Sequence, residues 1–169
     1  FSREGFLLLL SRLDAGILPL KMEAVDVYTA VSLAADNLQE VFEAAGLSVD
    51  IPEMGEMKIL ADLDWPMEAL MNLFKNCAEY TPPGGRIHCA CSQNPLYTEI
   101  ILWDDGKGFD KEDIPHLFER FYRGKNASGN GIGIGLSLAR EIIERQNGTI
   151  RAVNLPGKGA AFEIRFYSH

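Results

Sequence analysis

The stretch that decides the fold reads Gly129-Asn130-Gly131-Ile132-Gly133-Ile134-Gly135-Leu136, and a helical pattern begins at Gly135. Alternating glycines leave successive backbone N–H groups unobstructed, and a helix N-terminus carries partial positive charge. The stretch therefore predicts a phosphate-binding cradle, with Arg123 and Lys125 just upstream to reach the phosphates. A dinucleotide-binding loop is disfavoured because no short apolar strand precedes the glycines, and the Gly-Lys-Ser/Thr of a P-loop is missing.

A second polar segment, residues 104–109, precedes the glycine-rich stretch and directly follows an apolar strand. Its first residue, Asp104, is placed at a strand end, where a carboxylate can accept a hydrogen bond from an exocyclic amine such as that of adenine. Gly106 and Gly108 would let the backbone approach a flat ring closely. Taken alone, the segment is equally compatible with a simple tight turn.

A third group of polar residues lies on the helix predicted over residues 64–80. Asn72, Asn76 and Tyr80 are spaced four apart and therefore share one face. The asparagine side-chain oxygen is a hard neutral ligand that suits Mg²⁺. A hydrogen-bonded solvent face is the alternative for this helix considered by itself.

The order of elements favours an α/β two-layer sandwich, with a mixed, mostly antiparallel sheet of about five strands packed on three helices. Several strands arrive as hairpins, which argues against a parallel doubly wound sheet. The expected helices span residues 26–45, 64–80 and 135–146, after a helix end at 3–15. The expected strands span residues 20–27, 58–61, 86–92, 98–103, 149–154 and 160–166.

Composition excludes several classes of function. The chain of 169 residues has 16 Lys plus Arg against 24 Asp plus Glu, so a nucleic-acid partner is not expected. No apolar run reaches the ~18 residues of a membrane span. The first residue is Phe1 and no signal peptide is recognisable, so we expect a part of a longer protein.

Taken together, these segments resemble the catalytic ATP-binding domain of bacterial sensor histidine kinases, which has the Bergerat or GHKL fold. Residues 72–76 resemble the N box of that family, 104–108 the G1 box, 118–122 the F box and 131–136 the G2 box. The resemblance implies a C-terminal end of the dimerisation hairpin and linker over residues 1–18, and an ATP-binding domain over residues 19–169.

The resemblance also implies roles for single residues. Asn76 would ligate Mg²⁺, Asn72 would help to hold the phosphate end of ATP, and these two would be the catalytic residues. Tyr80 would pack on adenine, Asp104 would receive its amino group, and residues 121–130 would form a lid. The nucleotide-binding set implied by the family is Asn72, Asn76, Glu79, Tyr80, Asp104, Gly106, Gly108, Phe109, Phe118, Phe121, Arg123, Lys125, Gly129, Gly131, Ile132, Gly133, Ile134, Gly135 and Leu136.

Three departures from the family pattern bear on affinity. Glu79 stands where a Lys or Arg is usual, Ala160 replaces a Thr after the glycine of the last hairpin, and Ile132 takes a place often held by Thr or Ser. A non-catalytic nucleotide-binding or docking module is therefore one alternative function. A gyrase-like ATPase module is another, although Asn72 stands where those enzymes carry a glutamate base.

The implied reaction is transfer of the ATP γ-phosphoryl group to a histidine. His88, His116 and His169 lack the sequence context of an acceptor. The acceptor is therefore expected on an upstream dimerisation domain, in a homodimer that passes the phosphoryl group to a response regulator. The domain would be cytoplasmic and joined to the inner membrane only through upstream segments.

Overall fold

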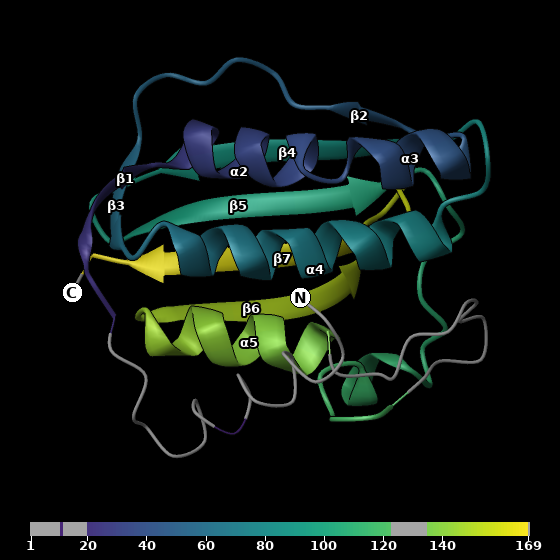
Figure 1. The fold of residues 1–169 in the computed structure, drawn as a ribbon. Helices are drawn as coiled ribbons and strands as arrows, with labels where there is room; N and C mark the ends of the chain where they lie inside the picture. The colour runs from purple at the N-terminus through teal and green to yellow at the C-terminus, as the bar shows by residue number, and fades with distance from the viewer. Residues whose placement is uncertain (1–10, 12–19, 123–134, 169) are drawn as a thin grey trace.

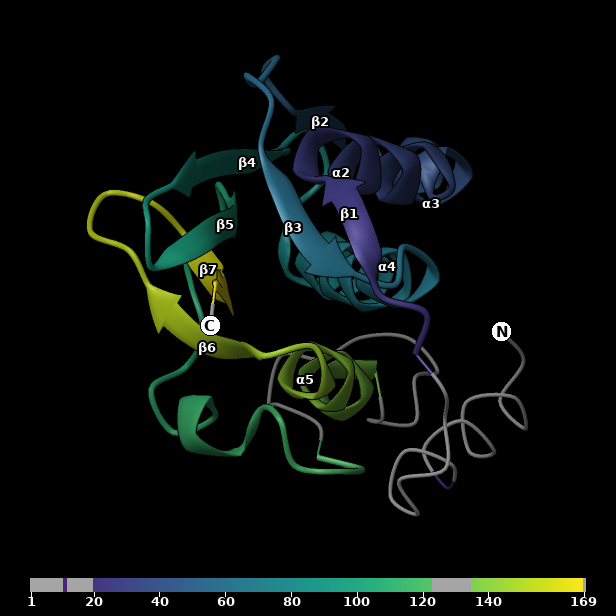
Figure 2. The same cartoon turned by 90° about the vertical axis from the view of Figure 1, so that its left-hand side faces the viewer.

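The structure, a computed structural model, describes residue 11 and residues 20–122 and 135–168. The elements form two layers, with helices on one face of a five-stranded sheet (Figures 1 and 2). In chain order the elements are β1 (Glu23–Asp26), α2 (Val27–Asp36), α3 (Gln39–Ala45), β2 (Ser48–Asp50), β3 (Lys58–Ala61), α4 (Asp64–Tyr80), β4 (Arg86–Gln93), β5 (Tyr97–Asp104), the 3₁₀ helix η1 (Ile114–His116), α5 (Gly135–Arg145), β6 (Gly148–Asn154) and β7 (Ala160–Tyr167).

The main sheet has the strand order β2-β4-β5-β7-β6. Neighbouring strands are antiparallel except β2, which runs parallel to β4, so the sheet is mixed. Strands β1 and β3 form a separate antiparallel pair. The predicted two-layer sandwich with a mixed, mostly antiparallel sheet is confirmed. Strand β2 was not predicted, because three residues, of which Val49 alone is apolar and only half-buried, are too few to show a strand pattern.

The core lies between the sheet and the helices. Side chains of β4 and β5 alternate, so that Ile87 and Cys89 on β4 and Leu102 on β5 are buried beneath the helical layer. Leu73 and Phe74 of α4 pack into the same core and are fully buried. The helix predicted over residues 64–80 is thereby confirmed as α4.

The single helix predicted over residues 26–45 is wrong, because α2 and α3 are separate helices. Asp26 caps α2 as its side chain accepts hydrogen bonds from the N–H and hydroxyl of Thr29, at 3.0 and 2.9 Å. The chain then turns at residues 37–38, where Leu38 has non-helical dihedrals (φ −110°, ψ 12°). Leu38 is buried on the same side as the α2 core residues, so the apolar pattern continues through the break and does not reveal it.

Within residues 20–122 and 135–168, no helix has both the length and the apolarity that a membrane crossing requires. The predicted helix over residues 3–15 and the predicted domain boundary at residue 18 fall in the part of the chain that is not described, apart from residue 11.

Candidate nucleotide-binding site

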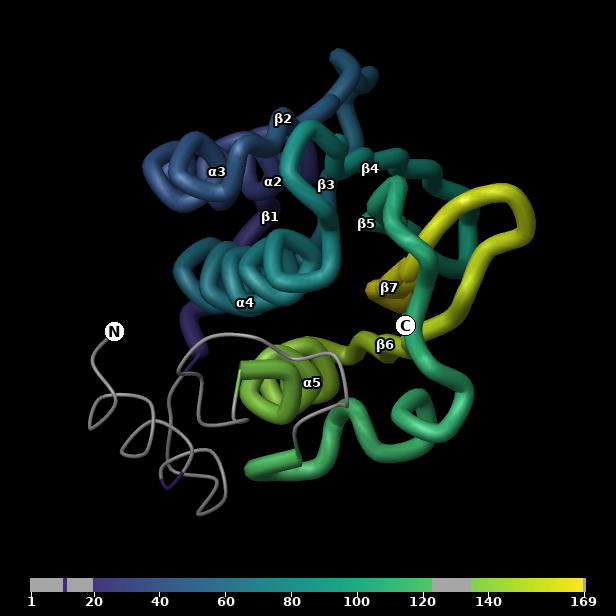
Figure 3. The backbone as a smooth tube through the Cα atoms, turned by 90° about the vertical axis from the view of Figure 1, so that its right-hand side faces the viewer, coloured from purple at the N-terminus to yellow at the C-terminus, as the bar shows by residue number. Residues whose placement is uncertain are grey.

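Four segments that are far apart in the sequence meet at one end of the molecule. The C-terminal end of α4, the end of β5, the N-terminus of α5 and the turn between β6 and β7 all lie toward the right of Figure 1, and Figure 3 views this end directly. Most of the described residues that were predicted to bind a nucleotide lie on these segments. The structure therefore brings together positions separated by more than 60 residues of sequence.

Asp104, the last residue of β5, is only 1% exposed. Its Oδ1 accepts a hydrogen bond from the Gly106 N–H at 2.8 Å. Its Oδ2 is buried and has no hydrogen-bond partner among the described residues. Burial raises the pKa of Asp104 above its ordinary value, and hydrogen bonding from the backbone of Gly106 and Ala160 opposes this rise. A buried acceptor without a donor is costly, so its position fits a ligand that supplies the donor.

Two glycines allow the backbone to pack directly on Asp104. The Gly159 N–H donates to the Asp104 carbonyl oxygen at 2.9 Å, and a Cβ atom at Gly159 would overlap the Asp104 carboxylate. A Cβ atom at Gly106 would lie 3.0 Å from both Asp104 Oδ1 and the Tyr80 carbonyl oxygen. The predicted role of Gly106 in shaping the turn thus has a steric basis, and Gly159 shares that role.

Asn154, at the end of β6, forms hydrogen bonds with the backbone of the same segment after β5. Its Nδ2 donates to the Phe109 carbonyl oxygen at 2.9 Å, and its Oδ1 accepts from the Phe109 N–H at 2.7 Å. Gly108 has a φ of +90°, and a Cβ atom there would meet the Asn154 amide. Sequence reasoning missed Asn154, since an asparagine before Leu155-Pro156-Gly157 indicates only a turn.

Aromatic rings pack against one another next to the end of α4 and the segment after β5. Phe109 is buried and contacts Tyr80 and Phe162 edge to face, with centroid distances of 5.6 Å in both cases. Phe118 packs on Phe162 at 6.3 Å. Phe121 is exposed and has a φ of +66°, which is uncommon for a residue with a side chain. Phe109 therefore supports Tyr80 directly, and Phe118 contributes through their shared neighbour Phe162.

The first of the two α4 asparagines, Asn72, lies beside the N-terminus of α5. Asn72 is 6% exposed, and a Cβ atom at Gly135 would lie 3.1 Å from its Oδ1. Asn76 follows one turn later on α4; its Oδ1 is buried and lacks a hydrogen-bond partner in the described part of the chain. Leu136 on α5 is buried, whereas Glu79 is exposed. The roles of these residues toward a nucleotide stay predictions.

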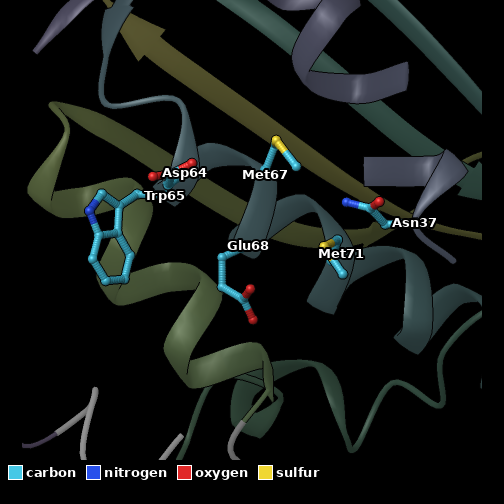
Figure 4. A pocket seen from close by; sticks show the side chains of 6 residues that line it. All are labelled: Asn37, Asp64, Trp65, Met67, Glu68 and Met71. Atoms are coloured by element: carbon cyan, nitrogen blue, oxygen red, sulfur yellow. The ribbon is translucent and has the colours of Figure 1, made fainter. Parts of the chain in front are cut away.

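Glu68 is a neighbour of Asn72 that sequence reasoning missed. The Asn72 Nδ2 donates to the Glu68 carbonyl oxygen at 2.9 Å and approaches its Oε1 at 3.4 Å. Burial raises the pKa of Glu68 above its ordinary value. The side chain also lines a groove on α4 together with Asn37, Asp64, Trp65, Met67 and Met71 (Figure 4). The spacing of four residues between Glu68 and Asn72 was the available signal.

Part of the predicted site falls outside the described residues. These positions are Arg123, Lys125, Gly129, Gly131, Ile132, Gly133 and Ile134, together with most of the lid predicted over residues 121–130. They stay predictions from the sequence.

Comparison with known proteins identifies the family. Residues 61–168 match the family described as "Histidine kinase-, DNA gyrase B-, and HSP90-like ATPase". The chain belongs to this family. The match covers more than half of the chain and includes every described residue of the site, so ATP binding follows from membership.

Relatives within the family are sensor kinases. The chain is 34% identical to the sensor protein SphS of Synechococcus elongatus over 92% of its own length, and 32% identical to the sensor-like histidine kinase SenX3 of Mycobacterium tuberculosis over 92%. It spans only 40% and 38% of these two relatives. The fold matches that of the Acinetobacter baumannii histidine kinase AdeS with a TM-score of 0.79, at 22% identity, over 97% of this chain and 76% of that one. The resemblance to a histidine kinase ATP-binding catalytic domain is thereby confirmed.

Proposed function

We propose that this domain, within a longer sensor kinase, transfers the γ-phosphoryl group of ATP to a histidine on a dimerisation domain. The single observation that carries the proposal is a pair of buried acceptors, Asp104 Oδ2 and Asn76 Oδ1, that find no hydrogen-bond partner among the described residues of a family member. Each acceptor matches a different part of MgATP, and two such atoms in one site are costly without ligands.

The adenine end is assigned to Asp104. A carboxylate oxygen accepts a hydrogen bond from the exocyclic amine of adenine, which guanine lacks at the corresponding ring position. Since Oδ1 is already held by the Gly106 N–H, Oδ2 is the atom that meets the base. Tyr80 lies beside this turn, with its carbonyl oxygen near Gly106, and would pack against the base.

The phosphate end is assigned to Asn76, Asn72 and the N-terminus of α5. Asn76 Oδ1 fits Mg²⁺, because the ion prefers hard oxygen ligands and keeps several waters. When bound, Mg²⁺ would neutralise charge on the phosphates. Asn72 and the first N–H groups of α5 would orient the phosphates, because a helix N-terminus favours anions. Arg123 and Lys125 would add cations from the lid.

The acceptor is assigned to another domain. Phosphoryl transfer needs positioning and charge neutralisation more than covalent chemistry by the enzyme, and these residues supply both. In this proposal the histidine belongs to the dimerisation domain of a homodimer, and a response regulator receives the phosphoryl group next. The domain would lie in the cytoplasm, attached to a membrane through other segments of the protein.

A phosphotransfer assay tests the proposal. The chain is mixed with the dimerisation domain of the same protein and γ-labelled ATP, and label on that domain is measured with and without Mg²⁺. We expect labelled histidine with the parent chain and strongly reduced label with Asp104→Asn. Rapid release of inorganic phosphate without labelling would instead identify an ATPase module. ATP binding with neither outcome would identify a non-catalytic module.

A further inference from the structure

The outer side of the sheet carries an unusual pair of rings directly behind the adenine end. His88 of β4 and Trp103 of β5 are register partners, and both lie on the side opposite the helices. Their rings are stacked, with centroids 5.1 Å apart and planes at 16°. Sequence reasoning assigned His88 no role, yet its side chain is only 19% exposed.

His88 connects this outer side to the turn that holds Asp104. Its Nε2 lies 2.8 Å from Oδ1 of Asp105, the residue between Asp104 and Gly106. An ionised carboxylate can only accept a hydrogen bond, so Nε2 carries the proton and donates it. The other ring nitrogen, Nδ1, lies 3.7 Å from Asp50 Oδ2 on β2. One imidazole ring therefore touches β2, β5 and the turn after β5.

Lys158 contacts the same group of residues from the turn between β6 and β7. Its Nζ lies 4.4 Å from the centroid of the Trp103 ring, a cation–π contact. Lys158 directly precedes Gly159, which packs on Asp104. His88 and Lys158 thus link Trp103 to the two segments that define the position of the Asp104 carboxylate.

We propose that His88 is a positioning residue for the adenine end of the site: by holding Asp105, it keeps the turn in the shape in which Gly106 binds Asp104 Oδ1 and Oδ2 faces the base. The inference deepens the proposed function and relies on it only for the identity of the ligand. His88 itself does not touch the nucleotide, since Asp104 and His88 lie on opposite sides of the sheet.

The first test measures affinity for ADP with Mg²⁺ by calorimetry. His88→Phe keeps a stacked ring and removes the hydrogen bond to Asp105, whereas His88→Gln keeps a neutral donor. Relative to the parent, we expect His88→Phe to weaken binding by about fivefold. His88→Gln should bind ADP as tightly as the parent.

The second test needs no nucleotide. Hydrogen exchange of the Gly106 amide, which donates to Asp104, should become about tenfold faster in His88→Phe and remain near the parent rate in His88→Gln. Arg151→Gln is the matched control, because it removes an ion pair on the same outer side, Arg151 to Glu163 at 3.0 Å, without touching the turn.

The two tests separate the inference from the proposed function. Parental ADP affinity and parental Gly106 exchange in a folded His88→Phe variant would overturn the role of His88 and leave the kinase proposal intact. A parent chain that binds no adenine nucleotide would overturn the kinase proposal, while Gly106 exchange would still decide whether His88 holds the turn. If His88→Phe does not fold, Asp105→Ala decides, because it removes the same hydrogen bond from the side of the turn. Parental ADP affinity and parental Gly106 exchange in Asp105→Ala would overturn the role of His88.

Discussion

The adenine and phosphate ends of the site hold their acceptors by different means. Asp104 is an acidic residue at a strand end, and the backbone of Gly106 and Gly159 packs directly on it. Asn76 is a neutral residue on a helix, and its neighbour Asn72 is oriented by a residue of the same helix, Glu68, and lies beside the start of α5. The first end is assembled from turns that follow different strands, and the second from two neighbouring helices.

The negatively charged side chain is thus at the adenine end, and the neutral side chain is at the phosphate end. Adenine is neutral, so a carboxylate can meet its amino group without repulsion. The phosphates are anionic, and a neutral amide there can accept a cation without adding negative charge to the site. We therefore expect substitutions that disturb the packed turn at the adenine end to affect both folding and binding, and substitutions at the phosphate end to act mainly on binding.

The largest expected effect is that of Gly159→Ala. The added Cβ atom overlaps the Asp104 carboxylate, so the turn must shift. We expect a loss of about 1–3 kcal/mol in the free energy of unfolding, as for overpacked sites, together with loss of measurable ATP binding. Denaturant unfolding and calorimetry measure the two effects. Gly55→Ala is the control, because a Cβ atom there meets nothing within 4 Å; equal behaviour of the two variants would contradict the close packing.

Asp104→Asn should weaken ATP binding without lowering the free energy of unfolding at pH 8. Losing the hydrogen bond to the base should weaken ATP binding by about 1–3 kcal/mol. Because burial raises the folded-state pKa of Asp104, the parent loses stability as pH rises from the ordinary value of 3.8 through that raised pKa. The variant lacks this loss and should be at least as stable as the parent at pH 8. Unfolding curves at pH 4 and pH 8 check the sign; a variant less stable only at pH 8 would refute it.

Asn76→Ala probes the phosphate end alone. It removes a buried, unpartnered acceptor, so the free energy of unfolding should not fall. ATP affinity with Mg²⁺ should drop by about tenfold, as expected when a metal ligand is lost, while affinity in EDTA should match that of the parent. A variant that loses affinity equally in Mg²⁺ and in EDTA would show that Asn76 is not a metal ligand.

Asn154→Ala tests whether the turn needs its connection to β6. It removes both hydrogen bonds to the Phe109 backbone and should cost about 1–2 kcal/mol of stability. ATP affinity should fall about threefold. Asn94→Ala is the control, since the Asn94 side chain also makes two hydrogen bonds to the backbone, accepting both, at 2.8 and 2.9 Å, next to the opposite end of β5. It should lower stability but leave affinity unchanged.

The smallest effect is expected from Glu79→Lys. Glu79 is exposed one residue before Tyr80, and its carboxylate opposes the charge of a polyphosphate through solvent. The variant should bind ATP about twofold more tightly at low salt, with the difference shrinking as salt rises. A salt titration of both proteins measures it, and coinciding curves would show that the charge at position 79 has no influence.

Much of the site was predictable from local sequence, because local spacing determines which residues share a helix face or end a strand. Asn72 and Asn76 on one face of α4, Asp104 at the end of β5, and Gly135 at the start of α5 follow from such spacing. The break between α2 and α3 did not follow, because the buried pattern runs through residues 37–38 without interruption.

Other features depend on contacts between distant segments, and only the tertiary structure decided them. Asn154 reaches Phe109 across 45 residues, and Gly159 meets Asp104 because the register of β5 and β7 brings Trp103 opposite Ala161. The same register leaves Asp104 Oδ2 buried without a partner among the described residues. The sequence by itself determined which polar residues are available, whereas strand pairing decided which of their atoms are already satisfied and which remain for a ligand.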